Sequence, residues 1–295
     1  MARTAATSGR RPKLGQNFLT DPSAARRIVE ALGDVSESTV VEIGPGRGVL
    51  TSLLVGRAQH VIAIELDRVL GAQLRMKYAH QPGIEVLEGD VLTIDFDSLL
   101  RRPRVAGDAN HRFPIPARVV GNLPYYITSP ILQRLLSFHD LFSMMVILVQ
   151  REVADRIAAR PGGREYGLLS ATVQLYARIE KLFTLPPGAF SPPPKVHSTA
   201  LRLTIESQEE ALGVRGSEFL EFLKLSFGQK RKTLVNNLKP HYPEAKIRAA
   251  LAKAGVRADA RAEALPLAKA AGVFKALAPS SDREERNQDP SLRSG

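Results

Sequence analysis

Short apolar runs alternate with longer amphipathic segments from residue 18 to residue 205. The first segment, 18–32, has apolar side chains at helical spacing, with Asp21-Pro22 as N-cap and first-turn residue, so we predict a helix there. The apolar runs have the length and composition of buried strands. Because they alternate with helices, they predict an α/β fold with a parallel sheet and right-handed crossovers. The predicted strands are 40–43, 61–64, 84–87, 117–121 and 144–149.

The later part of the chain divides the protein into two predicted domains. Residues 166–178 have a helical pattern, and 196–205 that of a last strand. From about Glu218 the sequence becomes rich in Ala, Leu and Lys, with short breaks at prolines and a glycine. We therefore expect an α/β domain over 14–205 and a helical domain over 206–278. The remaining stretches have no apolar periodicity and are predicted to be a disordered basic arm (1–13), an inserted Arg- and Pro-rich loop (101–116) and a disordered tail (279–295).

The charge of the chain points to a polyanionic partner. The formal net charge is +11 and the pI is near 10.1. The segment from Lys224 to Lys275 alone contains 12 Lys and Arg against 3 Asp and Glu. Such a segment suits nucleic acid, because Lys and Arg neutralise phosphates and release counterions. Within it, the cluster Lys230-Arg231-Lys232 is too polar for a core. It is either a phosphate-binding site, which we favour, or a solvated face.

Composition also excludes several classes of protein. The chain has no cysteine, so disulfides, thiol catalysis and zinc sites built on cysteine are excluded, and a reducing cytoplasm is the expected location. No metal site is predicted. No apolar run approaches the roughly 20 residues of a membrane span. The basic N-terminal stretch lacks the apolar segment of a secretory signal.

A glycine-rich loop after the first strand suggests a nucleotide ligand. In Glu42-Ile43-Gly44-Pro45-Gly46-Arg47-Gly48, glycines such as Gly44 and Gly46 let the backbone approach a ligand closely. Glu65, about 20 residues further on, suits a ribose hydroxyl, and Asp90 suits an adenine amine. A dinucleotide site has the fingerprint G-x-G-x-x-G, but here the third glycine comes one position early. An adenosyl ligand is indicated, and these residues leave open whether it is S-adenosylmethionine or a dinucleotide.

The run Asn122-Leu123-Pro124-Tyr125-Tyr126 follows the predicted strand 117–121, where open α/β sheets place their chemistry. Asn122 offers a side-chain acceptor, and Pro124 lacks an N–H group. The ring of Tyr125 offers a face on which a nucleobase can stack. Such a group of residues suits an exocyclic amine on an aromatic base, and it favours a methyl donor over a dinucleotide.

Taken together, these motifs resemble the ribosomal RNA adenine N6,N6-dimethyltransferase family, in its small-subunit branch. The family is recognised from motif blocks in this order along the chain: LGQNFL (14–19), VEIGPGRGVLT (41–51), IELD (64–67), EGDVL (88–92), NLPYYI (122–127), VQREVADRI (149–157), EYGLLS (165–170), FSPPPKV (190–196) and FGQKRKTLVNNL (227–238). Two features depart from the family pattern: loop 101–116 is longer, and His197 stands where an Asp commonly follows PKV.

The resemblance implies a Rossmann-like S-adenosylmethionine-dependent methyltransferase domain followed by a smaller all-helical domain that docks RNA. It implies a monomeric enzyme that dimethylates two adjacent adenosines near the 3′ end of small-subunit (16S) rRNA within a pre-30S particle. A large-subunit methylase of the macrolide-resistance type and a non-catalytic assembly or transcription factor on the same fold are the alternatives. The cofactor-binding residues implied are Asn17, Leu19, Gly44, Gly46, Glu65, Asp90 and Asn122.

For catalysis we expect Asn122 Oδ1 and a main-chain carbonyl near Leu123 or Pro124 to accept the two amine hydrogens of a flipped adenine. Tyr125 and Phe190 would clamp the base between them. Phe190 has a competing interpretation as a core aromatic beside a Pro-rich turn, and Tyr126 is as well explained by packing behind Tyr125. Gln16-Asn17 is either a lid over the donor or a helix N-cap.

Overall fold

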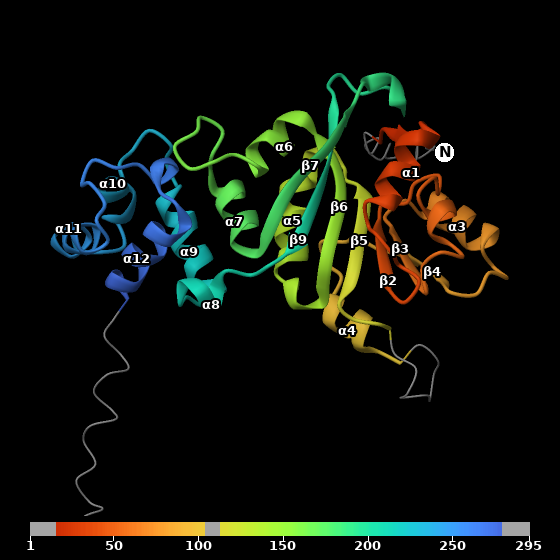
Figure 1. The fold of residues 1–295 in the computed structure, drawn as a ribbon, viewed down its shortest axis with the longest axis horizontal. Coiled ribbons are helices and arrows are strands. Elements are labelled where there is room, and N and C mark those ends of the chain that lie inside the picture. Colours follow the sequence, from red (N-terminus) through yellow and green to blue (C-terminus); the bar gives the residue numbers. More distant parts are fainter. Residues whose placement is uncertain (1–15, 104–112, 279–295) are drawn as a thin grey trace, which may run out of the picture. The chain divides into compact units, whose positions relative to one another are not determined.

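The computed structural model describes residues 16–103 and 113–278 and contains a seven-stranded sheet of order β4-β3-β2-β5-β6-β9-β7 (Figure 1). The five predicted strands all form, and they pair in parallel. The last strand runs antiparallel between two neighbours. The strands of this sheet are β2 (Thr39–Ile43), β3 (His60–Glu65), β4 (Ile84–Glu88), β5 (Ala117–Asn122), β6 (Phe142–Gln150), β7 (Ala177–Leu185) and β9 (Ser198–Ile205).

Helices connect the strands of this α/β part, as predicted, and the helix predicted over 18–32 forms over Pro22–Glu30. Asp21 caps the first helix, since its Oδ1 accepts the N–H groups of Ser23 at 2.8 Å and Ala24 at 3.1 Å. This helix begins at Pro22 rather than at residue 18. The helices are α1 (Pro22–Glu30), α2 (Thr51–Leu54), α3 (Arg68–Lys77), α4 (Phe96–Arg101), α5 (Thr128–Leu136) and α6 (Arg151–Ile157), with 3₁₀ turns η1 (Tyr125–Ile127), η2 (His139–Leu141) and η3 (Pro187–Ala189).

Two strand pairings were not predicted from the sequence. Residues 18–19 form a short strand, β1 (Phe18–Leu19), which pairs with β8 (Phe190–Ser191) outside the main sheet. The second pairing joins the edge strand β7 to β9. β7 has Arg178, Lys181 and Thr184 at its exposed positions and buries only its two ends. Charged residues are common on edge strands, where they discourage pairing with further strands. They also interrupt the apolar run that would identify the segment as a strand in the sequence.

The topology explains where a ligand would bind. The strand order reverses between β2 and β5, and in open α/β sheets the ligand crevice lies beyond the carboxyl ends of the strands at such a switch point. The central strands hold these ends rigidly, because β2 and β3 are buried along their whole length. The residues that follow β2, β3 and β5 are therefore presented from a fixed core.

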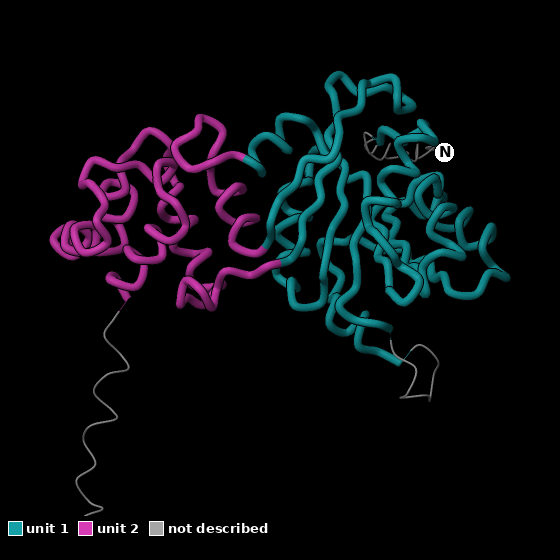
Figure 2. Tube along the Cα trace, in the orientation of Figure 1, with its two compact units in different colours: residues 1–158, 177–205 teal, residues 159–176, 206–295 magenta. Residues whose placement is uncertain are grey.

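The chain divides into two compact units (Figure 2), one of residues 1–158 and 177–205 and the other of 159–176 and 206–295. The predicted boundary at residue 205 assigns 159–176 to the α/β domain, whereas this division groups it with the helical unit. The reason is that α7 packs against α9 and the rings of Tyr166 and Phe227 meet at 6.1 Å. The described helices of this unit are α7 (Leu168–Tyr176), α8 (Glu209–Leu212), α9 (Gly216–Ser226), α10 (Leu234–Leu238), α11 (Glu244–Lys253) and α12 (Leu267–Leu277), with the 3₁₀ turn η4 (Ala262–Ala264).

The helical unit has its own aromatic core. The rings of Phe219, Phe222 and Phe274 meet with centroids 5.5 to 6.1 Å apart. Within the described ranges, every helix is too short or too polar to cross a membrane. The predicted basic arm 1–13 and tail 279–295 lie outside the described residues, as does the greater part, 104–112, of the predicted loop.

Candidate functional site

A cavity lies at the carboxyl ends of the parallel strands of the first unit. With its open mouth it measures about 1020 Å³, which is the size of a site for a nucleoside-sized ligand. Its walls come from residues 16–19, the glycine-rich loop, the ends of β3 and β4, and the segment 122–127. It brings together Asn17, Leu19, Gly44, Gly46, Glu65, Asp90, Asn122, Leu123, Pro124 and Tyr125.

Two glycines of the loop after β2 are needed for its shape. Gly44 and Gly46 have φ angles of 65° and 57°, a region that residues with a Cβ rarely adopt. A Cβ on Gly46 would lie 2.9 Å from the Phe18 ring, whereas a Cβ on Gly44 would meet no atom within 4 Å. The loop is therefore closely packed on one side and leaves room beside Gly44 for a ligand.

Glu65, the last residue of β3, holds this loop in place. Its Oε2 accepts the N–H of Gly46 at 2.8 Å, and its Oε1 accepts the N–H of Asp67 at 2.9 Å. Burial raises the pKa of the Glu65 carboxyl, and these backbone hydrogen bonds partly offset the rise. Each oxygen keeps a lone pair that a ligand hydroxyl can use.

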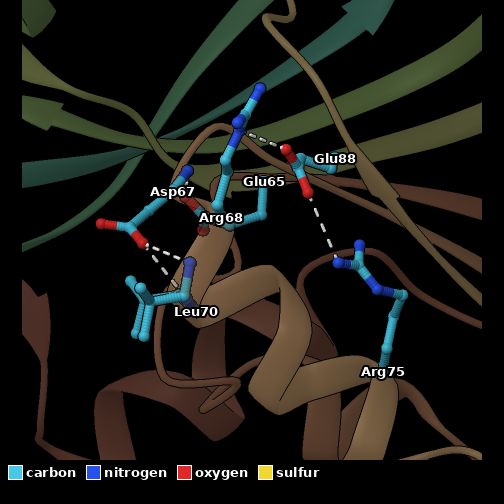
Figure 3. Close-up of polar contacts among 7 residues, drawn as sticks. Glu65, Asp67, Arg68, Leu70, Arg75 and Glu88 are labelled. Carbon is cyan, nitrogen blue, oxygen red and sulfur yellow. Dashed lines mark hydrogen bonds and ion pairs between the residues drawn. The ribbon is translucent and has the colours of Figure 1, made fainter.

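The helix after β3, α3, has a cap at its start and two ion pairs, one in its first and one in its last turn, to Glu88 (Figure 3). Asp67 Oδ1 accepts the N–H groups of Val69 and Leu70 at 2.9 and 3.2 Å. Glu88, at the end of β4, contacts Arg68 at 2.8 Å and Arg75 at 3.4 Å. These ion pairs join α3 to the end of β4, next to the part of the cavity wall that contains Glu65 and Asp90.

Asp90 lies at the far end of that wall. Its Oδ1 accepts the N–H of Leu92 at 2.9 Å, and its main-chain carbonyl accepts the N–H of Thr93 at 2.9 Å. The turn after β4 is thus built around Asp90, which lines the cavity. A carboxylate held in this way can accept a further hydrogen bond from an amine.

Glu42 is a buried acid of the cavity wall that was not predicted from the sequence as a site residue. It is 1% exposed, and burial raises the pKa of its carboxyl to about 7. The Thr51 hydroxyl donates to its Oε2 at 2.7 Å. An acidic residue inside an otherwise apolar buried strand was the sequence signal for this group.

Asn122, at the end of β5, has one half of its amide bonded and the other half free. Its Nδ2 donates to the main-chain carbonyl of Asn17 at 2.8 Å. Its Oδ1 is buried and has no hydrogen-bond partner in the described chain. A buried acceptor without a partner is costly. Because Asn122 lines the cavity, a ligand N–H group placed there would remove that cost.

The residues after Asn122 are arranged by the turn that follows. The carbonyl of Pro124 already accepts Ile127 N–H at 3.2 Å and the Thr128 hydroxyl at 3.0 Å. The Tyr125 hydroxyl is hydrogen-bonded to Ser198 Oγ at 2.6 Å. Burial raises the pKa of Tyr125, so the phenol stays neutral and its half-buried ring is fixed from the far end.

Comparison with known proteins identifies the family. The family model described as ribosomal RNA adenine dimethylase matches residues 7–279. The chain belongs to the ribosomal RNA adenine dimethylase family. Among its relatives, ribosomal RNA small subunit methyltransferase A of Koribacter versatilis is 54% identical, over 94% of this chain and 99% of the relative. The protein of the same name from Acidobacterium capsulatum is 52% identical, over 92% and 93%.

Solved structures agree with the dimethylase family. A dimethyladenosine transferase from Plasmodium falciparum superposes with a TM-score of 0.70 at 26% identity, over 87% of this chain and 95% of that one. The 23S rRNA methyltransferase ErmE superposes with a TM-score of 0.62 at 29% identity, over 88% and 99%. The predicted Rossmann-like methyltransferase fold is confirmed.

The two other aromatic residues considered for the dimethylase site lie elsewhere than expected. Phe190 is 3% exposed, belongs to the core and does not line the cavity, because β8 is held against β1 with Phe190 opposite Leu19. The predicted clamp between Tyr125 and Phe190 is therefore not formed in this structure. Tyr126 is 62% exposed and lines the cavity, so the interpretation that it packs behind Tyr125 is wrong.

The basic cluster lies in the second unit. Lys230, Arg231 and Lys232 are all exposed in the connection between α9 and α10. The Nζ of Lys230 donates to the carbonyl of Arg164 at 3.2 Å. The exposed positions fit both interpretations of this cluster, so its contact with RNA stays a prediction.

Proposed function

We propose that this dimethylase transfers methyl groups from S-adenosylmethionine to N6 of two adjacent adenosines near the 3′ end of small-subunit rRNA. The names of the 54% and 52% identical relatives support the choice of small-subunit RNA. The observation that carries the chemistry is the buried, unpaired Oδ1 of Asn122 beside the anchored ring of Tyr125. Such an acceptor suits an adenine amine.

The residues at the ends of β2, β3 and β4 form what we call the donor half of the cavity. In it, Glu65 would bind ribose hydroxyls and Asp90 the adenine amine of the donor. Gly44 and Gly46 would let the backbone lie against the donor, with Asn17 and Leu19 covering it. When bound, S-adenosylmethionine supplies a methyl group on a positively charged sulfur, which leaves with the electron pair of the broken bond.

Residues 122–125 form the acceptor half. The lone pair of an adenine amine is delocalised into the ring, so the amine is a weak nucleophile. Asn122 Oδ1 would accept one N6–H. The Pro124 carbonyl is already used within the turn, which leaves the Leu123 carbonyl as the second acceptor. Two such acceptors aim the lone pair at the methyl carbon, and the amine loses a proton to solvent as the new bond forms.

Tyr125 would stack on the flipped base. Its hydroxyl is fixed by Ser198, which is fully buried on β9. A ring held at its far end can offer one face in a constant orientation, and such a stack is worth about 1–3 kcal/mol. After the first transfer, only one N–H remains on N6, so a single acceptor is enough for the second.

The helical unit would supply the general affinity for RNA. Lys230, Arg231 and Lys232 are exposed and lie in the segment with the strongest excess of positive charge. We propose that they contact phosphates of the rRNA in a pre-30S particle, and that the protein acts there as a monomer in the cytoplasm.

The test is to map methylated adenosines by mass spectrometry in rRNA from cells with and without the gene. The proposal expects two adjacent N6,N6-dimethyladenosines in small-subunit rRNA to disappear with the gene and to return when purified protein and S-adenosylmethionine are added to subunits from those cells. Loss of a large-subunit methylation would indicate the macrolide-resistance type of activity. Unchanged methylation everywhere would indicate a non-catalytic factor.

A further inference from the structure

Tyr126 is an aromatic residue that the fold does not use. Among the Phe and Tyr residues within 16–103 and 113–278, it alone is exposed, at 62%. No hydrogen bond, ion pair or ring contact joins its side chain to another residue of those ranges. Single exposed apolar side chains are common on protein surfaces, so what distinguishes Tyr126 is where it lies.

Tyr126 lines the mouth of the cavity together with Asn122 and Tyr125. Tyr125 and Tyr126 are successive residues of the 3₁₀ turn η1, in which each residue is rotated by about 120° from the last. Their rings therefore leave the turn in different directions. Tyr125 is tied to Ser198, whereas Tyr126 is free to meet a ligand outside.

The chemistry of the substrate supplies that ligand. An adenosine that enters the cavity must leave its stack, so the base next to it loses a stacking partner. Proteins that bind unstacked RNA bases cover them with exposed aromatic rings. We propose that Tyr126 stacks on the nucleobase adjacent to the adenosine held in the cavity and so sets the register of the RNA. This inference rests on the proposed function, because it takes RNA adenosine as the substrate.

The experiment compares Tyr126→Ala and Tyr126→Phe with the parent enzyme on unmethylated small subunits. Loss of one stack should raise KM for the RNA roughly 5- to 150-fold, with kcat and the Kd for S-adenosylmethionine unchanged, and Phe should restore the parent KM. Met76→Ala is the matched control. It removes an apolar side chain that is 80% exposed on α3 and does not line the cavity, so it should change none of these quantities.

A binding measurement separates failure of this inference from failure of the proposed function. In small-subunit rRNA, 2-aminopurine beside the target adenosine is quenched while it is stacked. It should stay quenched on binding the parent or Tyr126→Phe, and gain fluorescence on binding Tyr126→Ala. This readout needs no methyl transfer, so an inactive parent would defeat the proposed function without deciding the stack. An unchanged KM and equal quenching in Tyr126→Ala would overturn the inference. So would a weaker Kd for the donor, which would mean that Tyr126 covers the donor instead.

Discussion

In the donor half of the cavity the carboxylate of Glu65 accepts two backbone N–H groups, whereas in the acceptor half the buried Oδ1 of Asn122 accepts none. The first arrangement fixes the wall before any ligand arrives. The second leaves an acceptor that a ligand N–H group in the cavity can use. The donor half is thus organised by the protein's own hydrogen bonds, whereas in the proposed function the acceptor half would be completed by the target base.

The largest expected effect is in the acceptor half. Asn122→Ala removes the unpaired acceptor, so kcat should fall about 10²- to 10³-fold, as for the loss of one positioned hydrogen-bonding group in other enzymes. Affinity for RNA should change little, because the basic segment lies elsewhere in the sequence. Single-turnover methylation and RNA binding by the same variant measure both quantities. Weakened RNA binding with normal turnover would contradict the role given to Asn122.

The second prediction tests the buried acid behind the donor half. The pKa of Glu42 is about 7 in the folded protein, against 4.5 as its ordinary value. Between pH 4.5 and about pH 7 the folded state binds more protons than the unfolded chain. The free energy of unfolding should therefore fall as pH rises through this range and level off above about pH 7. Complete loss of the stabilisation that comes from the raised pKa of Glu42 should lower the free energy of unfolding by roughly 3 kcal/mol.

Urea unfolding at pH 5 and pH 8 checks this prediction, with Glu42→Gln as the comparison. Gln keeps an acceptor for the Thr51 hydroxyl and has no proton to lose, so its stability should depend less on pH than that of the parent. Equal pH dependence in the two proteins would mean that Glu42 titrates near its ordinary value.

A smaller effect is expected when one hydrogen-bonding group of the donor half is removed. Asp90→Ala should weaken binding of S-adenosylmethionine by about 1–3 kcal/mol, because the adenine amine is left without a partner. Calorimetry with the methyl donor measures the change, and NAD serves as the comparison ligand. If the parent protein bound NAD more tightly than the methyl donor, the assignment of the donor half would be wrong.

The last prediction concerns the basic cluster Lys230-Arg231-Lys232, whose removal should have the smallest effect on the cavity. It tests whether this cluster contributes to the affinity for RNA. Replacing Lys230, Arg231 and Lys232 by Ala should lower RNA affinity and reduce the slope of log affinity against log salt by about 0.9 for each phosphate that is no longer neutralised. Binding of S-adenosylmethionine should be unchanged. An unaltered slope would mean that this cluster faces water.

The sequence by itself determined the elements that local pattern specifies. The five parallel strands and the cap at Asp21 follow from apolar runs and turn chemistry. The parallel strands in turn require a crevice at their carboxyl ends. Ten of the predicted site residues line one cavity for the same reason, since each stands at the end of a strand, in the loop after it or in the segment that covers it.

Tertiary structure decided what depends on contacts between distant segments. The orientation of the Asn122 amide is fixed by a carbonyl 105 residues away, and the Tyr125 ring by a serine 73 residues away. Phe190 enters the core because β8 pairs with β1, while Tyr126, with an equally aromatic side chain, stays exposed. No local pattern distinguishes these two rings, because burial is a property of what packs against a residue and not of the residue itself.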